Sequence, residues 1–557
     1  MLRNSLALAT ALTTLAASWA ANAQTTPSPA STPATIDPAC VQLTGLRLAN
    51  TQIDGAAVMS RGDLQPIGAF GVPTLPAETA YCRVSVTLTP SPGSEIHSEI
   101  WLPPAAAWNG KFTAVGNAGF GGSLGPPRLA MRPAITRGYA VAATDMGHTE
   151  PGADGKDASW ALNQPERIID FGHRANHVTA VAAKALIDAY YGRLPVRSYF
   201  QGCSDGGREA LMAAQRYPDD FDGIIAGAPA ASWTRLMTSF AWSWKVAHEN
   251  PASRLTKPNL ARIQAAALEA CDTVDGVKDG VIEDPRACHF DPTNILCSND
   301  ATGGCISPEQ LAALKGLYGG PRRGLTGDSL YPGFSPGGEA QRSGWDLWIT
   351  EPTAQHPDFA RSFFANFVFD NADWTLSQFD FAESFDIAQA RMAEITDSDN
   401  PNMAAFKASG GKLLMYHGWN DAALPAEGTI RYFDQVREVM GSEEVDAFAR
   451  LYMVPSMGHC FGGPGPNAFD SLGELDKWVE GAPAPDRIIA SKYANDLAVF
   501  LNMSTGPALS TRPLCAYPRV ARWSGEGATT DAANFQCVVP QESDSRPSRT
   551  APDMRDL

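Results

Sequence analysis

The chain has 557 residues, an apolar content of 44% and a net charge of −17. This apolar content is typical of a packed globular protein and argues against a largely disordered chain. The negative charge excludes a nucleic acid as an obvious partner, since binding a polyanion requires a basic surface. No segment after the N-terminal region has about 18 uncharged apolar residues in a row, so we expect neither a transmembrane helix nor a membrane partner.

The first residues are typical of a secretory signal peptide. Arg3 gives a positive start, an apolar run extends from Leu6 to Trp19, and residues 21–23 (ANA) form a small-x-small cleavage site. The apolar run is too short to span a bilayer. We therefore predict a signal peptide over residues 1–23 and a mature protein that is secreted or periplasmic. The Thr/Ser/Pro-rich residues 24–39 predict a flexible leader.

Beyond the leader, short apolar strands alternate with helical stretches, such as Val178–Tyr191. Strands of this kind are buried on both faces, so the pattern predicts a largely parallel sheet covered by helices on both sides, the α/β class. The predicted core strands are Lys111–Gly116, Tyr139–Thr144, Ser198–Gln201, Gly223–Ala226, Lys412–Tyr416 and Arg450–Val454.

The alternation stops between about residues 232 and 405, where Gly/Pro-rich stretches, four cysteines and many aromatic residues occur. We predict that residues 232–405 form a lid domain inserted between two parts of the core, 40–231 and 406–540. Residues 541–557 are polar and predict a disordered tail. The lid aromatics are Trp233, Trp242, Trp244, Trp345, Trp348, Phe359, Phe363, Phe364, Phe367 and Trp374.

Residues 202–206 (GCSDG) fit the nucleophile-elbow pattern G-x-S-x-G. The predicted strand Ser198–Gln201 precedes the motif, and a helical stretch, Glu209–Arg216, follows it. In this context the serine stands on a sharp strand-to-helix turn, and the N-terminal N–H groups of the helix face developing negative charge. The sequence therefore predicts that Ser204 is the nucleophile of an α/β-hydrolase.

Two later loops supply an acid and a histidine in the chain order expected after such a serine. The predicted strand Lys412–Tyr416 leads into a loop with Asp421, and the predicted strand Arg450–Val454 leads into a loop with His459. His417 is the alternative general base, but it lies at a strand end close to the acid, and we interpret it as structural. The predicted catalytic triad is Ser204, Asp421 and His459.

The negative charge of a tetrahedral intermediate needs N–H donors. One is the N–H of Asp205, which follows the nucleophile. The second is expected in the segment 117–122 (NAGFGG), which follows a predicted core strand. Several glycines of this segment are candidates, and we choose Gly119.

The ten cysteines form an even set without a C-x-x-C pair, which argues for disulfides in an exported protein and against a zinc ribbon or a thioredoxin motif. We expect five bridges. Cys203 precedes the predicted nucleophile and Cys460 follows the predicted histidine, so a Ser204–His459 hydrogen bond would bring both cysteines within bridging distance. Cys271 and Cys288, like Cys297 and Cys305, would close short loops.

Residues 272–280 (DTVDGVKDG) place three carboxylates in one tight loop. Such charges repel one another unless a hard cation with oxygen ligands offsets them, and main-chain carbonyls of Val277 and Val281 would complete its shell. The spacing differs from that of an EF-hand. The two hypotheses are a calcium site and a solvated turn, and the candidate carboxylate ligands are Asp272, Asp275 and Asp279.

Four motifs, GCSDGGREA, HGWNDAALP, VPSMGHCFGGPG and CDTVDGVKDGV, together resemble the tannase and feruloyl esterase family, which includes a mono(2-hydroxyethyl) terephthalate hydrolase. The likeness extends from about Cys40 to Cys537. It implies an α/β-hydrolase with a lid, the triad and the oxyanion donors named above, and structural calcium at the acidic loop. The disulfides that it implies are Cys203–Cys460, Cys40–Cys82, Cys271–Cys288, Cys297–Cys305 and Cys515–Cys537.

The resemblance implies a carboxylic ester hydrolase for esters of aromatic acids of the hydroxycinnamic, gallic or terephthalic type. The aromatic lid suits a flat acyl group, although a packed lid has the same composition. A terephthalate-type substrate calls for a cation near its free carboxylate, for which the lid offers Arg342 and Arg361. A serine peptidase or amidase on the same fold and a non-catalytic binding relative are the alternative functions. The sequence does not specify the oligomeric state.

Overall fold

The computed structural model describes residues 37–69, 72–150, 155–298, 304–501 and 506–540. These ranges belong to one compact unit. The predicted signal peptide, almost all of the predicted leader and the predicted tail lie outside the described residues. Helix α2 (Pro38–Gln42) begins before residue 40, where we expected the core to start. Within the described ranges, no helix is long and apolar enough to cross a membrane.

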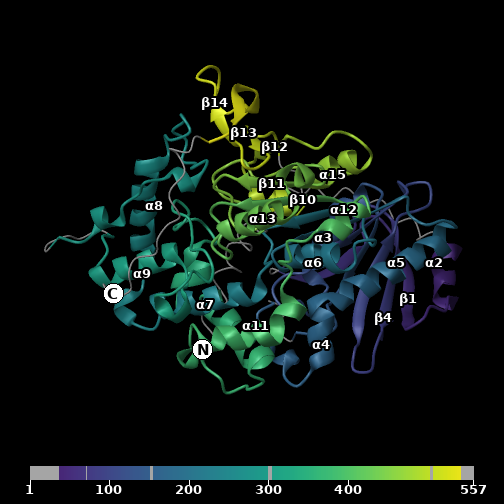
Figure 1. The fold of residues 1–557 in the computed structure, drawn as a ribbon. Coiled ribbons are helices and arrows are strands. Elements are labelled where there is room, and N and C mark those ends of the chain that lie inside the picture. The colour runs from purple at the N-terminus through teal and green to yellow at the C-terminus, as the bar shows by residue number, and fades with distance from the viewer. Residues whose placement is uncertain (1–36, 70–71, 151–154, 299–303, 502–505, 541–557) are drawn as a thin grey trace, which may run out of the picture. The chain divides into compact units, whose positions relative to one another are not determined.

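A nine-stranded sheet forms the centre of the unit, in the order β1-β4-β5-β7-β6-β8-β9-β10-β11. The strands from β7 to β11 in this order run parallel, and the pairs β1–β4, β4–β5 and β5–β7 are antiparallel. In Figure 1, β1 and β4 lie at one edge of the sheet, in purple and blue, far from β10 and β11. The bounds are β1 Thr51–Met59, β4 Tyr81–Leu88, β5 Ile96–Leu102, β6 Lys111–Val115, β7 Ala140–Thr144, β8 Arg197–Cys203, β9 Gly223–Gly227, β10 Lys412–Gly418 and β11 Ala449–Val454.

The parallel strands coincide with the six predicted core strands, within a few residues at each end. Successive side chains of a strand point to opposite faces of the sheet. Both faces of this part of the sheet are covered, so each of these strands is a nearly continuous apolar run. In β10, for example, Leu413 and Met415 pack into one core cluster, and Leu414 packs into the cluster on the opposite face. The antiparallel strands β1, β4 and β5 were not predicted.

Helices cover both faces of the sheet. Side chains of α5, α6 and α13 belong to one core cluster, and side chains of α3 and α15 belong to the other. The arrangement is an α/β-hydrolase core, as the sequence predicted. The bounds of these helices are α3 Gly125–Thr136, α5 Ala175–Tyr191, α6 Asp205–Arg216, α13 Glu427–Met440 and α15 Ser471–Val479.

The chain between β9 and β10 is mainly helical and corresponds to the predicted lid. Figure 1 shows these helices in teal and green, gathered beside the sheet. Most of the predicted lid aromatics are buried: Phe363 and Phe364 are fully enclosed, and Trp233 and Trp345 are nearly so. These rings therefore fill the interior of the lid and the interface between the lid and the sheet. The helices are α7 Trp233–Ala247, α8 Lys257–Cys271, α9 Pro308–Gly319, α10 Gln355–Phe363, α11 Glu383–Thr396 and α12 Ala404–Ala408.

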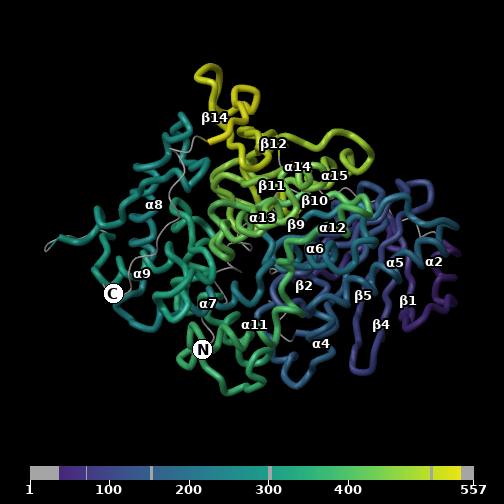
Figure 2. Tube along the Cα trace, in the orientation of Figure 1, coloured from purple at the N-terminus to yellow at the C-terminus, as the bar shows by residue number. Residues whose placement is uncertain are grey.

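The last part of the chain forms two small antiparallel hairpins beyond β11, in yellow in Figure 2. Strand β13 contacts β11, which attaches the first hairpin to the core. The hairpins pair β12 (Arg487–Lys492) with β13 (Ser510–Cys515) and β14 (Val520–Trp523) with β15 (Phe535–Val538). A third hairpin, β2 (Leu64–Ala69) with β3 (Val72–Pro76), lies near the N-terminal end of the unit's sequence.

Candidate active site

The predicted nucleophile lies on the strained turn between β8 and α6. Ser204 has φ 67° and ψ −123°, a backbone conformation that L residues rarely adopt. Its N–H donates to the Gly227 carbonyl at 3.0 Å, and its carbonyl accepts the N–H groups of Gly207 and Arg208. A Cβ at Gly202 would lie 2.2 Å from the Gly206 carbonyl oxygen, so the elbow requires glycine there. This is the geometry that the motif predicted.

The predicted acid and histidine meet at the same edge of the sheet. Asp421 follows β10, and His459 follows the neighbouring strand β11. His459 Nδ1 donates to Asp421 Oδ2 at 2.8 Å, since an ionised carboxylate only accepts. This bond leaves Nε2 as the nitrogen available to exchange a proton with a serine hydroxyl.

Asp421 is fully buried and is surrounded by donors. Its Oδ1 accepts the N–H groups of Ala423 at 2.8 Å and Leu424 at 2.9 Å, and its Oδ2 also accepts His417 Nε2 at 3.1 Å. Burial alone would raise the pKa of the Asp421 carboxyl, but the facing His459 and His417 imidazoles hold this pKa well below its ordinary value. Asp421 is therefore an ionised carboxylate in a fixed orientation.

Both ring nitrogens of His417, the alternative base, are hydrogen-bonded to other protein groups. Its Nδ1 faces the Thr429 hydroxyl at 2.7 Å, and its Nε2 faces both Asp421 and the Leu424 carbonyl. Its side chain is 1% exposed, whereas that of His459 is 16% exposed. His459 is thus the more accessible of the two histidines that contact Asp421.

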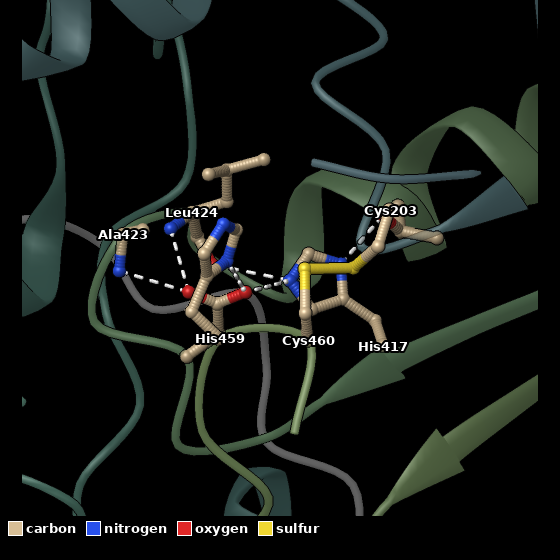
Figure 3. Close-up of a disulfide and its surroundings, with 8 residues drawn as sticks. Cys203, His417, Ala423, Leu424, His459 and Cys460 are labelled. Atoms are coloured by element: carbon tan, nitrogen blue, oxygen red, sulfur yellow. Dashed lines mark hydrogen bonds and ion pairs between the residues drawn. A yellow bond between two sulfur atoms is a disulfide. The ribbon is translucent and has the colours of Figure 1, made fainter. Parts of the chain in front are cut away.

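A disulfide joins the loops of Ser204 and His459. Cys203 and Cys460 are bonded, with their Cα atoms 6.0 Å apart and a sequence separation of 257. Figure 3 shows this bridge beside His417 and His459. All the cysteines of the chain lie among the described residues, and none of them is free. The remaining pairs are Cys40–Cys82, Cys271–Cys288, Cys297–Cys305 and Cys515–Cys537, the pairs that the resemblance implied.

The segment 117–122 after β6 packs against the elbow, where the Asn117 carbonyl accepts the Gly206 N–H at 3.1 Å. Gly119 has φ +59°, and a Cβ there would lie 2.3 Å from the Gly155 carbonyl oxygen, which explains the glycine. Within the described residues, the Gly119 N–H has no protein acceptor, whereas every other N–H of the segment donates to one. Those acceptors are Glu209 Oε1, Asn117 Oδ1, and the carbonyls of Gly155, Ala118 and Asp145.

The lid contributes to this edge of the sheet. The Trp348 ring meets the His459 ring in a T-shaped contact, with their centroids 5.3 Å apart. His356 Nε2 donates to the Ala423 carbonyl at 3.0 Å and so connects α10 to the loop of Asp421. Arg342 and Arg361, the candidate cations for a terephthalate-type substrate, are exposed.

The acidic loop of the lid lies against β13. Asp272 Oδ1 accepts the N–H groups of Asp279, Gly280 and Val281, and Asp275 Oδ1 accepts that of Val277. In the part of the chain that the structure describes, no group of three or more His, Cys, Asp or Glu side chains is gathered as a metal site. The loop carboxylates are therefore held by hydrogen bonds in this conformation.

Two residues that the sequence analysis missed complete this region. Arg512 of β13 is 2% exposed; its Nη2 lies 2.7 Å from Asp279 Oδ2, and its Nη1 lies 3.5 Å from Asp275 Oδ2 and 3.4 Å from Glu283 Oε2. Burial raises the pKa of Asp275 to about 6 and that of Glu283 to about 8. No local pattern could reveal Arg512, because it is more than 200 residues from the loop in sequence.

The donor chemistry of the loop fits calcium. Three carboxyl groups, those of Asp275, Asp279 and Glu283, face the single guanidinium of Arg512. Within the described residues Asp275 Oδ2 is buried without a hydrogen-bond donor. Calcium prefers oxygen ligands of this kind, and a charge surplus favours a divalent cation. The candidate ligands remain Asp272, Asp275, Asp279 and the carbonyls of Val277 and Val281.

The fold and the arrangement at the carboxyl edge of its sheet define an α/β-hydrolase. The elbow of Ser204 follows β8, the segment 117–122 follows β6, and the loops of Asp421 and His459 follow β10 and β11. The order serine, acid, histidine is that of the class. The chain belongs to the tannase and feruloyl esterase family: the family model described as "Tannase and feruloyl esterase" matches residues 82–538.

Similar proteins agree with this family. An uncharacterized esterase of Xanthomonas campestris is 39% identical over 91% of this chain and 92% of that protein. A mono(2-hydroxyethyl) terephthalate hydrolase of Piscinibacter sakaiensis is 33% identical over 83% of this chain and 85% of its own length. Among solved structures, feruloyl esterase B from Aspergillus oryzae superimposes with a TM-score of 0.81 at 27% identity and covers 90% of this chain and 99% of its own. The protein is a carboxylic ester hydrolase.

Proposed function

We propose that the protein hydrolyses esters of aromatic acids through an acyl-enzyme formed on Ser204. The single observation that carries this proposal is the constellation at the carboxyl edge of the sheet, in which His459 is hydrogen-bonded to the fully buried Asp421 and tied by the Cys203–Cys460 bridge to the elbow of Ser204. The same elements occur together in serine hydrolases.

The reaction proceeds in two halves. Ser204 Oγ attacks the ester carbonyl carbon while its proton passes to His459 Nε2, and a tetrahedral oxyanion forms. The intermediate collapses, the alkoxide leaves with the proton from His459, and an acyl-enzyme remains. A water molecule then attacks the acyl carbon, His459 again takes and returns a proton, and the aromatic acid leaves Ser204. Asp421 orients the imidazole and stabilises its charged form.

The oxyanion donors in this proposal are the N–H groups of Gly119 and Asp205. The Gly119 N–H is available because it has no protein acceptor within the described residues, and the Asp205 N–H is the first N–H of α6. The first N–H groups of a helix lack intrahelical partners, and the positive end of its dipole favours negative charge there. Removing one such donor typically costs about 100- to 1,000-fold in kcat.

Two observations support an aromatic acyl group. The lid residue Trp348 contacts His459 and is only partly buried, so it offers a flat apolar surface beside the predicted general base. The similar proteins named above include a feruloyl esterase and a mono(2-hydroxyethyl) terephthalate hydrolase. The substrate class is therefore an ester of a hydroxycinnamic, gallic or terephthalic type acid.

We also propose that the protein acts outside the cytoplasm, in a secreted or periplasmic form. Five disulfides support an oxidising compartment. The N-terminal signal-peptide pattern supports the same compartment.

Calcium is the proposed structural cofactor. It would be held by Asp272, Asp275, Asp279 and the carbonyls of Val277 and Val281, and it would offset the negative charge of the lid loop. Two observations support this assignment: the surplus of carboxylates over the single guanidinium of Arg512, and the absence, within the described residues, of a hydrogen-bond donor to Asp275 Oδ2. Within the described residues, none of these side chains is hydrogen-bonded or ion-paired to Ser204, Asp421 or His459. We therefore expect calcium to stabilise the lid and to take no part in the bond-breaking steps.

The test is a product-resolved screen of methyl ferulate, methyl gallate and mono(2-hydroxyethyl) terephthalate, with p-nitroanilides as the amide controls. We expect release of the aromatic acid from at least one ester and no anilide turnover at a comparable rate. Anilide turnover that exceeds ester turnover would favour a peptidase or amidase. Absence of turnover, together with absence of labelling by a phosphonate, would favour a non-catalytic binding protein.

A further inference from the structure

A buried carboxyl group of α6 connects the elbow to the segment 117–122. Glu209 is 3% exposed and lies one helical turn after Asp205. Its Oε1 accepts the Asn117 N–H at 3.0 Å, and its Oε2 accepts Asn176 Nδ2 at 2.6 Å. Asn117 in turn accepts the Gly206 N–H through its carbonyl at 3.1 Å. Glu209 thus touches the residue that begins the segment of Gly119.

The charges around Glu209 do not balance if both neighbouring acids are ionised. Arg208 is fully buried, and its Nε pairs with Asp205 Oδ1 at 2.5 Å. Its terminal nitrogens donate to the main-chain carbonyls of Phe171 and Gly172. One guanidinium therefore serves two buried carboxyl groups, and a second buried negative charge without a cation of its own is unfavourable. One of the two acids must hold a proton.

Asp205 is the acid that pairs with Arg208, so the proton belongs on Glu209. Asp205 Oδ2 is buried, and no donor N–H or hydroxyl of the described residues reaches it. The carboxyl group of Glu209 lies against Asp205 and interacts with it. Burial raises the pKa of Glu209 well above its ordinary value, and the nearby Asp205 charge raises it further. An O–H on Glu209 would supply the donor that Asp205 Oδ2 lacks.

We infer that Glu209 is a positioning residue: a neutral carboxylic acid that donates its O–H to Asp205 Oδ2 while it accepts the Asn117 N–H. Through these two bonds it fixes the separation of the two proposed oxyanion donors, Asp205 and Gly119. The inference rests on the proposed function, because the oxyanion exists only if Ser204 forms a tetrahedral intermediate.

A role of this kind has a distinct kinetic signature. The oxyanion develops its charge in the transition state, so loss of alignment between its donors weakens binding of the transition state more than binding of the substrate. A substitution at Glu209 should therefore lower kcat with little change in KM. A purely structural role would lower the amount or stability of folded enzyme and leave kcat per folded molecule unchanged.

The experiment compares Glu209→Ala with Glu209→Gln in the ester assay. Glutamine is neutral, and its amide can donate to Asp205 Oδ2 and accept the Asn117 N–H, so it should mimic a protonated glutamate. We expect Glu209→Ala to lose about 10- to 100-fold in kcat at an unchanged KM, since a displacement of about 1 Å can cost this much. We expect Glu209→Gln to retain kcat within about threefold, well under the tenfold that about 1.4 kcal/mol represents.

Infrared spectroscopy gives a second readout that does not depend on the folding of Glu209→Ala. The difference spectrum of the wild-type enzyme minus Glu209→Gln at neutral pH should contain the carbonyl stretch of a protonated carboxylic acid. Glu99→Gln is the matched control, because Glu99 is equally buried but pairs with Arg128 at 2.6 Å, remote from the elbow in the sheet. It should give no such band and leave kcat unchanged.

Absence of the acid band would overturn the inference. So would a folded Glu209→Ala with the kcat of the wild type, or a Glu209→Gln that loses more than tenfold in kcat. Ser204→Ala in the same assay separates this inference from the proposed function. If Ser204→Ala is inactive and Glu209→Ala is fully active, only the positioning role fails; if Ser204→Ala is active, the proposed function fails.

Discussion

Two buried aspartates of this protein, Asp421 and Asp275, differ in how their oxygens are satisfied. Asp421 accepts four hydrogen bonds from two imidazoles and two main-chain N–H groups. Asp275 accepts one N–H, at Oδ1, and its Oδ2 has no donor within the described residues. The pKa of Asp421 is lowered by its partners, and that of Asp275 is raised to about 6 by burial.

The contrast is between a group that the proposed mechanism uses and a group that the proposed calcium ion would bind. The protein itself supplies all the donors that hold Asp421 ionised and oriented, so the acid can stabilise an imidazolium without reorganisation. Asp275 shares the single guanidinium of Arg512 with Asp279 and Glu283, and the proposed cation would balance the remaining negative charge. The predictions below test these two sides of the comparison.

The largest effect should follow from removing the Asp421 charge. Asp421→Asn should lower kcat by about 10⁴-fold, the scale seen when a triad aspartate becomes an amide, because His459 loses the acceptor that fixes its tautomer. Asp220→Asn is the matched control, because it changes another aspartate–histidine contact. Asp220 Oδ2 lies 2.7 Å from Nδ1 of His177, a residue of α5. Steady-state kinetics should show a normal kcat for the control, and a fully active Asp421→Asn would remove Asp421 from the mechanism.

The next effect concerns the bridge that joins the loops of Ser204 and His459. Replacing both Cys203 and Cys460 by alanine should lower kcat by about 10- to 100-fold and change KM less, since the separation of Ser204 and His459 loses its constraint. A bridge over so long a loop contributes about 5 kcal/mol of stability in the chain-entropy model. Replacing Cys515 and Cys537, which close a 22-residue separation in the C-terminal hairpins, should lower stability without lowering kcat.

Removal of the proposed calcium from the loop of Asp275 should lower the stability of the protein. Calcium at about 100 times its Kd would stabilise the folded state by about 2.7 kcal/mol, so chelation should lower Tm and added calcium should restore it. Asp275→Ala should lower Tm and abolish the calcium response. Asp291→Ala, which removes an exposed helix-capping acid of the same lid, should keep that response. An unchanged Tm after exhaustive chelation would identify the loop as a solvated turn.

The smallest effect is the pH dependence of the Asp421 contribution to stability. Because its pKa is lower in the folded state than in the unfolded state, the contribution is complete above the unfolded value of about 4 and is lost as pH falls through the lower folded value. The unfolding free energies of the wild type and Asp421→Asn should therefore converge below about pH 4. A difference that stays constant down to pH 2 would contradict the assigned ionisation.

The parallel half of the sheet was predictable because its strands are apolar runs that are buried on both faces, such as Lys412–Gly418. The antiparallel half was not, since β1 alternates partly exposed residues and its register shifts between Ile53 and Gly55. Ser204, Asp421 and His459 could be predicted to lie at one edge of the sheet, because each follows a predicted core strand and these strands are parallel.

The partners of the site residues could not be predicted. Arg512 reaches the acidic loop from a hairpin that is more than 200 residues later in the chain, and nothing in its local sequence indicates a buried cation. Glu209 had one signal, a charged residue within the otherwise apolar run EALMAA of α6. Its contacts with Asn117 and Asn176 depend on the packing of three separate elements, which spacing along one chain does not specify.

The identity of the nucleophile is the central claim, and active-site labelling combined with Ser204→Ala tests it most directly. We expect a phosphonate to label the wild-type enzyme once, on the peptide that contains Ser204, and to abolish ester turnover. We expect folded Ser204→Ala to escape labelling and to lose at least about 10³-fold in kcat, because the covalent step is removed. Labelling of another residue, or retention of more than about a tenth of the wild-type kcat by Ser204→Ala, would contradict the claim.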